Sequence, residues 1–339
     1  MCKRFYGECL AFSERVARFR VLCYTEITKR GLSQIPHEYS RILALLFSIG
    51  NNWRKLAFTM NIGEFKYLRP KTIKEACELK DKFRESNFLA GGTFLIPLAR
   101  HTQNIPKNLI SLKGIPKLSE INLKRSILTI GATATLDDLA QDVFIKEKLP
   151  LLSEVLSYVS SAQIRNMATI GGSLCCGLPW VDLPIALLIL DAQIEIAGFK
   201  ANALVSIDDF MAAPKLVVKN KLLSNIKIKI PNQRLRYGFV RFSKTTESDL
   251  PLVSVCAAIS QGHNNKQKVI FAVNFGNRFS RRLNNTEKIF KENKLVLEWN
   301  SELENLIKQE IQILETDEYR RSIIIVCFKK AVEKINADY

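Results

Sequence analysis

The sequence predicts an α+β protein in which two lobes are followed by a smaller α+β domain. The chain has 339 residues, of which 47% are hydrophobic and 24% charged. That is enough apolar material for more than one core, and it excludes a disordered protein. From about residue 60, helix and strand patterns alternate irregularly, and the chain closes with three strands followed by helices. Mixed and then segregated elements of this kind are typical of α+β architecture.

Residues 1–59 differ from the remainder of the chain. They hold three of the eight cysteines and a net charge of +6 (10 basic minus 4 acidic residues). Their apolar residues keep no clean helical or alternating period, whereas a regular pattern starts after Met60. We therefore treat 1–59 as an extension of unclear status, either an appendage or an upstream translation of a gene that starts at Met60. A helical extension of the native protein is the alternative. If residues 1–59 are an appendage or an upstream translation, we expect a chain that starts at Met60 to keep its fold.

The first predicted lobe covers residues 60–115. A short strand at 65–70 precedes a helix that runs to about residue 83. Thr72 has the position of its N-cap, with Glu75 at the capping-box spacing. A buried strand then turns at Gly91-Gly92, and a further apolar strand covers 108–112.

The second predicted lobe covers residues 116–231. Thr135, with Asp138 three residues later, has the pattern of a helix start. The expected strands are 127–132, 193–197 and the strictly alternating 223–231; the expected helices are 135–139, 151–159, 183–190 and a capped turn at 206–210. Residues 164–172 are interpreted as a loop with a glycine pair.

The last predicted domain covers residues 232–339. Its expected strands are 237–242, 252–259 and 268–276, and its expected helices are 286–291, 300–313 and 317–334. The final helix places its apolar residues mostly on one face, which indicates packing against the strands.

Charge and cysteine usage exclude several functional classes. The net charge is +17, from 50 Lys and Arg against 33 Asp and Glu, but no run of five like charges and no nucleic-acid motif occurs. We therefore expect no nucleic-acid partner. No apolar stretch is long enough for a membrane span, no secretory signal is present, and the cysteines fit reduced thiols, so we expect a cytoplasmic protein. Three histidines and no C-x-x-C spacing leave no metal site.

Two glycine-rich segments have the character of an anion site. The first is Ala90-Gly91-Gly92-Thr93, and the second runs from Ile164 to Cys175 and contains Thr169 and the pair Gly171-Gly172. Glycine pairs let backbone N–H groups approach a ligand, and successive N–H groups with a nearby hydroxyl suit a pyrophosphate. The Rossmann and P-loop fingerprints are both absent.

The run Gln163-Ile-Arg-Asn-Met-Ala-Thr-Ile-Gly-Gly-Ser-Leu-Cys, followed by Asp182-Leu-Pro-Ile-Ala-Leu-Leu-Ile-Leu-Asp-Ala, resembles a known family. It is similar to the FAD-binding medium subunit of the molybdenum hydroxylases, of the xanthine dehydrogenase and carbon monoxide dehydrogenase flavoprotein type. The opening Phe65-Lys-Tyr-Leu-Arg-Pro, the strand from Leu222 and the run from Thr316 to Arg321 resemble the same family. The resemblance covers about 60–335.

The resemblance implies a fold and a role. The fold would be a two-lobed FAD-binding domain of the p-cresol methylhydroxylase type, followed by a small C-terminal flavoprotein domain. The partners would be a molybdopterin-binding large subunit and a [2Fe–2S] small subunit. This chain would receive electrons from the clusters and pass them from FAD to NAD or another acceptor, with no catalytic residue for substrate chemistry.

The resemblance also assigns residues to the flavin site. Ala90, Gly91, Gly92, Thr93 and Phe94 would hold the diphosphate from one side, and Thr169, Gly171, Gly172 and Ser173 would hold it from the other. Asp182 would lie near the sugar-adenine end, with a helix-terminal carboxylate as the alternative. Leu222 would lie near the isoalloxazine.

Two alternatives stay open from the sequence. One is a stand-alone flavin reductase of the same fold, for which we find no convincing set of acid and substrate residues. The other is a non-catalytic scaffold that has lost FAD. Departures from the family pattern motivate it: the bulky Trp180 beside the expected adenine end, Asn220-Lys221 before the strand that leaves the flavin domain, and Phe94 after the first segment.

Overall fold

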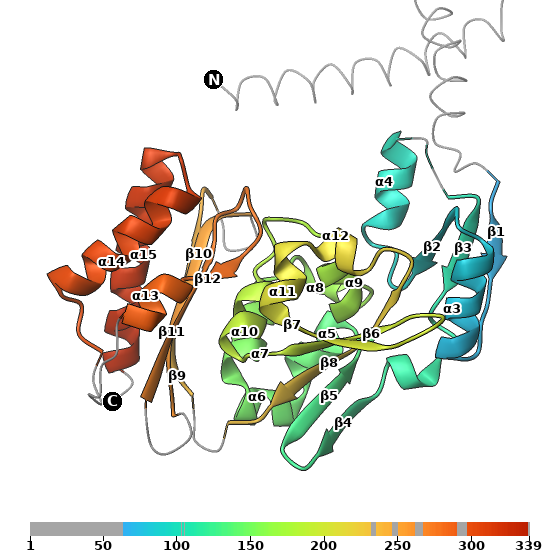
Figure 1. The fold of residues 1–339 in the computed structure, drawn as a ribbon, viewed down its shortest axis with the longest axis horizontal. Coiled ribbons are helices and arrows are strands. Elements are labelled where there is room, and N and C mark those ends of the chain that lie inside the picture. The colour runs from blue at the N-terminus through green and yellow to red at the C-terminus, as the bar shows by residue number, and fades with distance from the viewer. Residues whose placement is uncertain are drawn as a thin grey trace, which may run out of the picture. The chain divides into compact units, whose positions relative to one another are not determined.

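The computed structural model describes residues 64–102, 104, 106–231, 235–245, 250–261, 267–289 and 297–337. Our interpretation of residues 1–59 lies outside this part of the chain. The described residues form three sheets with helices on their faces, so the α+β class is confirmed (Figure 1). No helix in the described part is long and apolar enough to cross a bilayer.

The first sheet is parallel and small. Its strands β1 (Lys66–Leu68), β3 (Asn108–Ser111) and β2 (Ser86–Leu89) lie in the order β1-β3-β2. Helix α3 (Ile73–Lys82) crosses between β1 and β2, and Thr72 caps it as predicted, because its Oγ1 accepts from the Glu75 N–H at 3.1 Å. Helix α4 (Leu95–Thr102) follows β2.

The second sheet is antiparallel, with strands in the order β4-β5-β8-β6-β7. Its strands are β4 (Ile121–Lys124), β5 (Ile127–Gly131), β8 (Leu222–Lys229), β6 (Gln193–Ala197) and β7 (Ala203–Ser206). Its helices are α5 (Leu136–Gln141), α6 (Val143–Lys148), α7 (Pro150–Ser157), α8 (Ala162–Arg165), α9 (Ile170–Cys175), α10 (Leu183–Ile189), α11 (Ile207–Ala212) and α12 (Pro214–Val217). A 3₁₀ turn, Pro116–Leu118, connects the first sheet to the second.

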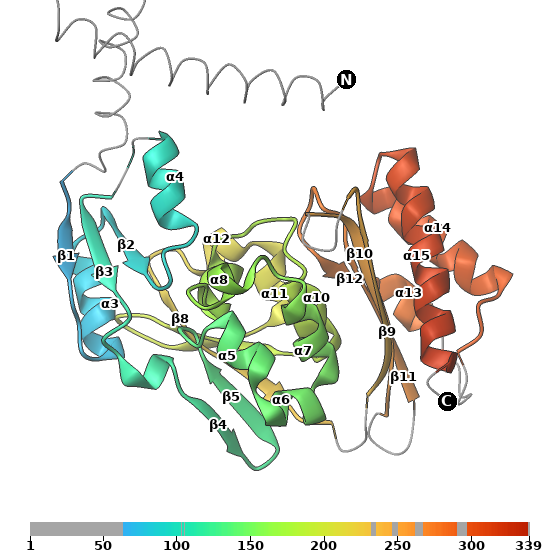
Figure 2. The same ribbon diagram turned by 180° about the vertical axis from the view of Figure 1, so that it is seen from behind.

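The third sheet is antiparallel, with strands in the order β12-β11-β10-β9. These are β9 (Arg236–Ser243), β10 (Pro251–Gln261), β11 (Gln267–Asn274) and β12 (Arg281–Arg282). Helices α13 (Asn284–Ile289), α14 (Ser301–Leu314) and α15 (Glu318–Ala337) lie on one side of this sheet, and the second lobe lies on the other (Figure 2).

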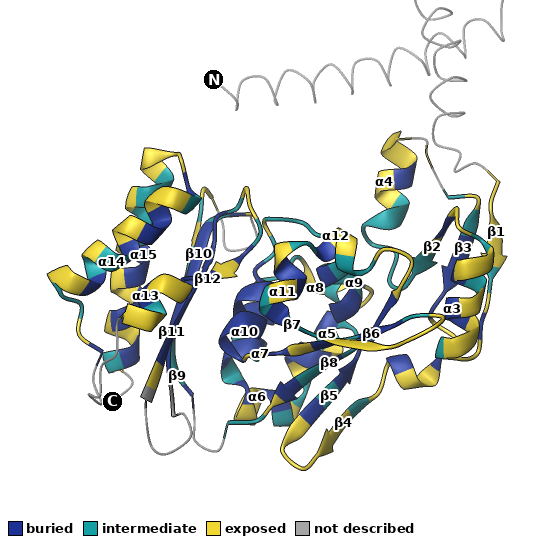
Figure 3. Ribbon diagram, in the orientation of Figure 1, coloured by how far each residue is buried: buried dark blue, intermediate teal, exposed yellow. Residues whose placement is uncertain are grey.

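The third sheet is buried on both faces (Figure 3). Along β10, Val255 and Ala257 join the core under the C-terminal helices, while Cys256 and Ala258 join the core of the second lobe. Successive side chains along a strand point to opposite faces of the sheet, so β10 contributes side chains to both cores. The C-terminal sheet therefore shares its core with the lobe before it.

Helix α10 is the central contact between the second lobe and the third sheet. All seven of its residues are buried, and it packs against β10 and β11. Arg282 on β12 reaches Asp191, just beyond the end of α10, at 3.4 Å, and Asp208 on α11 at 3.8 Å, while it holds Glu287 at 2.6 Å. Apolar packing and ion pairs thus join the same elements.

One element prediction was wrong, and several elements, among them α4, α6, β4 and β7, were not predicted. Residues 164–172 are not a loop, because they contain the end of α8 and the start of α9, and the glycine pair lies in the first turn of α9. Strand β4 was missed. It joins β5 through a turn at Arg125 and Ser126, which have φ angles of 47° and 65°. Two-residue hairpin turns with positive φ angles usually contain Asn or Gly, and this turn contains neither.

Candidate functional site

The first glycine segment is a series of free backbone donors. It follows β2 and enters α4, so its residues precede the first hydrogen-bonded turn of a helix. Within the described residues, the N–H groups of Gly91, Gly92, Thr93 and Phe94 donate to no protein oxygen. Gly92 has a φ of +74°, the left-handed conformation that glycine adopts without strain. A left-handed residue among right-handed neighbours is a feature of anion-binding nests, in which successive N–H groups face one ligand.

The two glycine segments touch through their backbones. A Cβ added at Gly91 would lie 1.8 Å from the Met167 carbonyl oxygen and 3.2 Å from the Ala168 Cα. Only a glycine permits this approach. The structure therefore brings the two sequence-predicted segments together, although 76 positions separate Gly91 from Met167.

The second segment uses its N–H groups to hold itself in place. Gly171 donates to the Ala132 carbonyl at 2.9 Å, and Ser173 donates to the Thr169 carbonyl at 2.8 Å. Gly172 donates to the Thr169 Oγ1 at 3.1 Å, so Thr169 is the N-cap of α9. What this segment can offer a ligand is therefore its hydroxyl groups. The assignment of Thr169, Gly171, Gly172 and Ser173 to the diphosphate stays a prediction.

Gly171 is packed against protein. A Cβ there would lie 2.6 Å from the Ala132 Cβ and 2.8 Å from the Ala132 carbonyl oxygen. Its lack of a side chain lets α9 lie directly on the chain that continues from β5. Sequence reasoning found this glycine but did not find Ala132, because nothing local marks Ala132 as the surface that α9 contacts.

Asp182 lies at the start of α10 and is buried, with a relative exposure of 4%. Its Oδ2 accepts from the Arg241 Nε at 3.0 Å, and its Oδ1 accepts from the Asn274 Nδ2 at 2.9 Å. Burial raises the pKa of the Asp182 carboxyl, and hydrogen bonds from neighbouring side chains oppose that shift only in part. The carboxylate thus has partners from β9 and β11, which sequence reasoning did not find, and it makes no side-chain cap bond to α10.

The structure also shows the surroundings of Leu222, Trp180 and Arg165, three other residues near the expected site. Leu222 is buried, with 3% exposure, mainly among residues of the first lobe, and its side chain packs in that core. Trp180 is at the surface, with 36% exposure. Arg165 contacts Asp137 at 3.6 Å and donates to the carbonyl oxygens of the turn after α7.

The cysteines near the second segment are poor nucleophiles. Burial raises the pKa of Cys175 to about 12 and that of Cys176 to about 11. Thiols of this kind stay protonated near neutral pH, and the thiolate is the reactive form. Packing is therefore the role that their surroundings support.

A comparison with protein-family models identifies residues 63–233, which is half of the chain, as "FAD binding domain in molybdopterin dehydrogenase". The chain belongs to this family. FAD is accordingly its cofactor, and the chain is an FAD-binding medium-subunit type protein of the molybdenum hydroxylases.

Named relatives agree with this membership. The carbon monoxide dehydrogenase medium chain of Afipia carboxidovorans is 31% identical over 185 residues, which cover 54% of this chain and 64% of that protein. The xanthine dehydrogenase FAD-binding subunit of Escherichia coli O157:H7 is 30% identical over 149 residues, covering 44% of this chain and 51% of that protein. The chain thus matches less than two thirds of the length of either relative.

The likeness to solved structures extends further along the chain. A chain of the reconstituted CO dehydrogenase from Oligotropha carboxidovorans has a TM-score of 0.73 and 25% identity. It covers 82% of this chain and 99% of its own length. The third sheet and its helices therefore belong to the shared fold.

The residues present fit FAD. The diphosphate carries two negative charges, and the first segment supplies four successive N–H groups without protein acceptors. The hydroxyl groups of Thr93 and Ser173 add potential donors, since neither hydroxyl has a hydrogen-bond partner among the described residues. The contact between Gly91 and Met167 brings the second segment beside the first.

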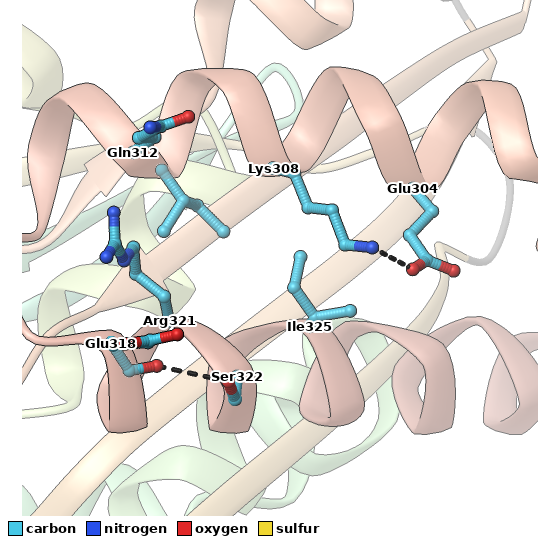
Figure 4. A pocket seen from close by; sticks show the side chains of 8 residues that line it. Glu304, Lys308, Gln312, Glu318, Arg321, Ser322 and Ile325 are labelled. Carbon is cyan, nitrogen blue, oxygen red and sulfur yellow. Dashed lines mark hydrogen bonds and ion pairs between the residues drawn. The ribbon is translucent and has the colours of Figure 1, made fainter.

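A separate groove lies between α14 and α15, at the other end of the described chain (Figures 1 and 4). Its volume is about 490 Å³. Its lining residues are Glu304, Lys308, Ile311, Gln312, Glu318, Arg321, Ser322 and Ile325. Lys308 and Glu304, which are one turn apart on α14, form an ion pair of 2.5 Å along one wall, and no glycine is among the lining residues. The groove offers no site for a diphosphate, so the candidate site remains at the two glycine segments.

Proposed function

We propose that this chain is the FAD-carrying electron-transfer subunit of a molybdopterin-dependent dehydrogenase. It receives electrons from [2Fe–2S] clusters of a small partner subunit and passes them to NAD or another acceptor. The observation that carries the proposal is the joined pair of glycine segments, because the free N–H groups of 91–94 meet the second segment where Gly91 contacts Met167. FAD, when bound, supplies the step between one-electron donors and a two-electron acceptor.

In this proposal the protein binds FAD and orients it. The N–H groups of Gly91 to Phe94 hold the diphosphate, and α9, fixed by the Thr169 cap and by Gly171 on Ala132, holds it from the other side. Asp182 is fixed by Arg241 and Asn274 near the sugar-adenine end. No residue of this chain is assigned to substrate chemistry, which belongs to the large molybdopterin-binding subunit.

The alternatives make different demands on the chain. A stand-alone flavin reductase needs its own substrate acid, and a scaffold without FAD needs no free N–H groups at 91–94. The test is to purify the full chain, record its flavin absorbance, and mix it with the reduced small [2Fe–2S] subunit. We expect one FAD per chain and reduction of that FAD by the clusters. A colourless protein that takes up no added FAD contradicts the proposal, and a flavoprotein that the clusters do not reduce favours the reductase.

A further inference from the structure

A basic surface with exposed apolar side chains lies beside the flavin domain's last strand. It comprises Phe199, Lys200, Leu216, Lys219 and Lys221, which we call the lysine surface. The end of β6 pairs with the start of β8, since Ala197 lies opposite Leu222. A Cβ at Gly198 would lie 3.8 Å from the Lys221 Cγ. The turn after β6 and the residue before β8 are thus adjacent in space. Leu216 and Lys219 belong to the segment that leads from α12 to this point.

The charge of the lysine surface has no local balance. Residues 196–207 and 210–222 contain no Asp or Glu. Lys200, Lys219 and Lys221 are exposed, and within the described residues none of them lies within 4.0 Å of a carboxylate. By contrast, Lys227 on the same sheet pairs with Glu195 at 3.3 Å. Unpaired charges of one sign produce a field that attracts an acidic partner.

The lysine surface also has the composition of a protein interface. Phe199 is 53% exposed and Leu216 is 69% exposed, and both are large side chains. A few apolar anchors with a charged rim are typical of protein–protein contacts, where the anchors supply affinity and the charges supply encounter rate and orientation.

The lysine surface borders the candidate flavin site. Leu222 directly follows Lys221, and Lys215 packs over the end of α9, with its Cε 3.6 Å from the position of a Cβ at Gly177. A protein bound at this surface would therefore contact the segments that enclose the cofactor.

We propose that the lysine surface docks an acidic face of the electron-donating protein subunit. This rests on the proposed function, because the donor is the small [2Fe–2S] subunit of the same complex. Phe199 and Leu216 insert into the contact, while Lys200, Lys219 and Lys221 face carboxylates of the partner. The partner class follows from sign and composition: three unpaired lysines together with two exposed apolar side chains favour an acidic protein surface.

The test reverses the charges and keeps a matched control. The variant K200E/K219E/K221E changes the net charge by six, and so does K288E/K329E/K330E. The three control lysines are exposed on α13 and α15 and form no ion pair with another described residue. Each full-length chain is loaded with FAD and mixed with the reduced small [2Fe–2S] subunit at low and at physiological salt. Flavin content and reduction by dithionite are measured in parallel.

We expect the K200E/K219E/K221E chain to be reduced at least tenfold more slowly by the subunit at low salt, with a weaker salt dependence. Complementary charge raises association rates by 10- to 1,000-fold and is screened over a Debye length of about 8 Å at physiological salt. The control variant should stay within about twofold of the unchanged chain. A second variant, F199S/L216S, should bind the subunit more weakly at every salt concentration.

The outcomes separate this inference from the proposed function. If the unchanged chain is reduced by the subunit and the K200E/K219E/K221E chain matches the control, the lysine surface is not the docking site. Binding of a polynucleotide is measured in the same buffers. If the K200E/K219E/K221E chain loses that binding but still binds the subunit, the surface is a nucleic-acid site and the inference is wrong. If the unchanged chain holds FAD but the subunit does not reduce it, the proposed function fails instead.

Discussion

At the scale of single residues, glycines determine the candidate site because each one lets two backbones meet. Gly91 leaves room for the Met167 carbonyl, and Gly171 leaves room for Ala132. From the sequence alone, the missing side chains are expected to let backbone N–H groups approach a ligand. The structure assigns their absence instead to contacts between protein segments, and this changes what a substitution does. A larger residue displaces a segment and the N–H groups it carries, before it meets any cofactor.

The first prediction concerns Gly91→Ala. Its Cβ would lie 1.8 Å from the Met167 carbonyl oxygen, so the two segments must separate. We expect the variant to lose most of its FAD and about 1–3 kcal/mol of stability, the usual cost of overpacking. The control is Gly114→Ala in the same lobe, where the nearest atom is 3.4 Å away. Flavin absorbance and urea unfolding measure both effects; equal flavin content in the two variants would falsify the proposed contact.

At the scale of elements, the N-caps were predictable and helix α9 was not. Thr72, Thr135 and Ser206 each cap a helix at the expected residue, because a hydroxyl three residues before a free N–H is a local signal. Strand β8 was predicted from strict alternation, and it shows alternating burial after Ser224.

Helix α9 was missed because Gly171 and Gly172 are unfavourable inside a helix. Its position depends on Ala132 and Ala134, which are distant in sequence. Likewise, the partners of Asp182 come from 59 and 92 positions away and carry no local signal.

The second prediction tests the cap of α9. Thr169→Val keeps the shape of the side chain and removes the oxygen that accepts from the Gly172 N–H at 3.1 Å. Thr72→Val removes the same bond, at the same 3.1 Å, from α3. Each substitution should cost about 1 kcal/mol of stability. Only Thr169→Val should weaken FAD binding, by tenfold or more, because only α9 lies in the candidate site. Titration of the apoprotein with FAD compares the two, and equal affinities would place α9 outside the site.

At the scale of the whole molecule, the C-terminal sheet is joined to the flavin domain by one core and two charged contacts. Cys256 and Ala258 from β10 belong to the core of the second lobe, and α10 packs on the same sheet. Arg241 holds Asp182 before the start of α10, and Arg282 contacts Asp191 beyond its end. The domain boundary at residue 231 therefore divides the sequence but not the hydrophobic core. The strands are predictable from sequence patterns. The shared core is not, because it depends on which face of the third sheet packs against the second lobe.

The third prediction tests the buried contact at Asp182. Arg241→Met leaves the carboxylate, 4% exposed, without its cationic partner, and we expect a loss of about 3 kcal/mol. The double variant Arg241→Met/Asp182→Asn removes the uncompensated charge and should recover most of that loss. As a control, Lys107→Met breaks the exposed 3.2 Å pair with Glu85 and should produce no measurable change. Denaturant unfolding gives the three free energies. A double variant no more stable than Arg241→Met would show that the charge is not the cause.

The last prediction uses Cys256, which lies in the shared core with no exposed surface. Burial raises the pKa of its thiol well above the ordinary value of 9.0. The unfolded thiol ionises near pH 9, whereas the folded thiol stays protonated, so its contribution to stability is complete below pH 9 and is lost as the pH rises toward the folded pKa. The free energy of unfolding then falls by at most about 1.4 kcal/mol per pH unit.

Cys256→Ala removes this titration, while the lysines and tyrosines that ionise in the same range remain in both chains. The difference in unfolding free energy between the two chains should therefore be constant up to about pH 8.5 and should shift against the unchanged chain between pH 9 and 11. A difference that stays flat to pH 11 would mean that the thiol titrates alike in both states and that water reaches the shared core.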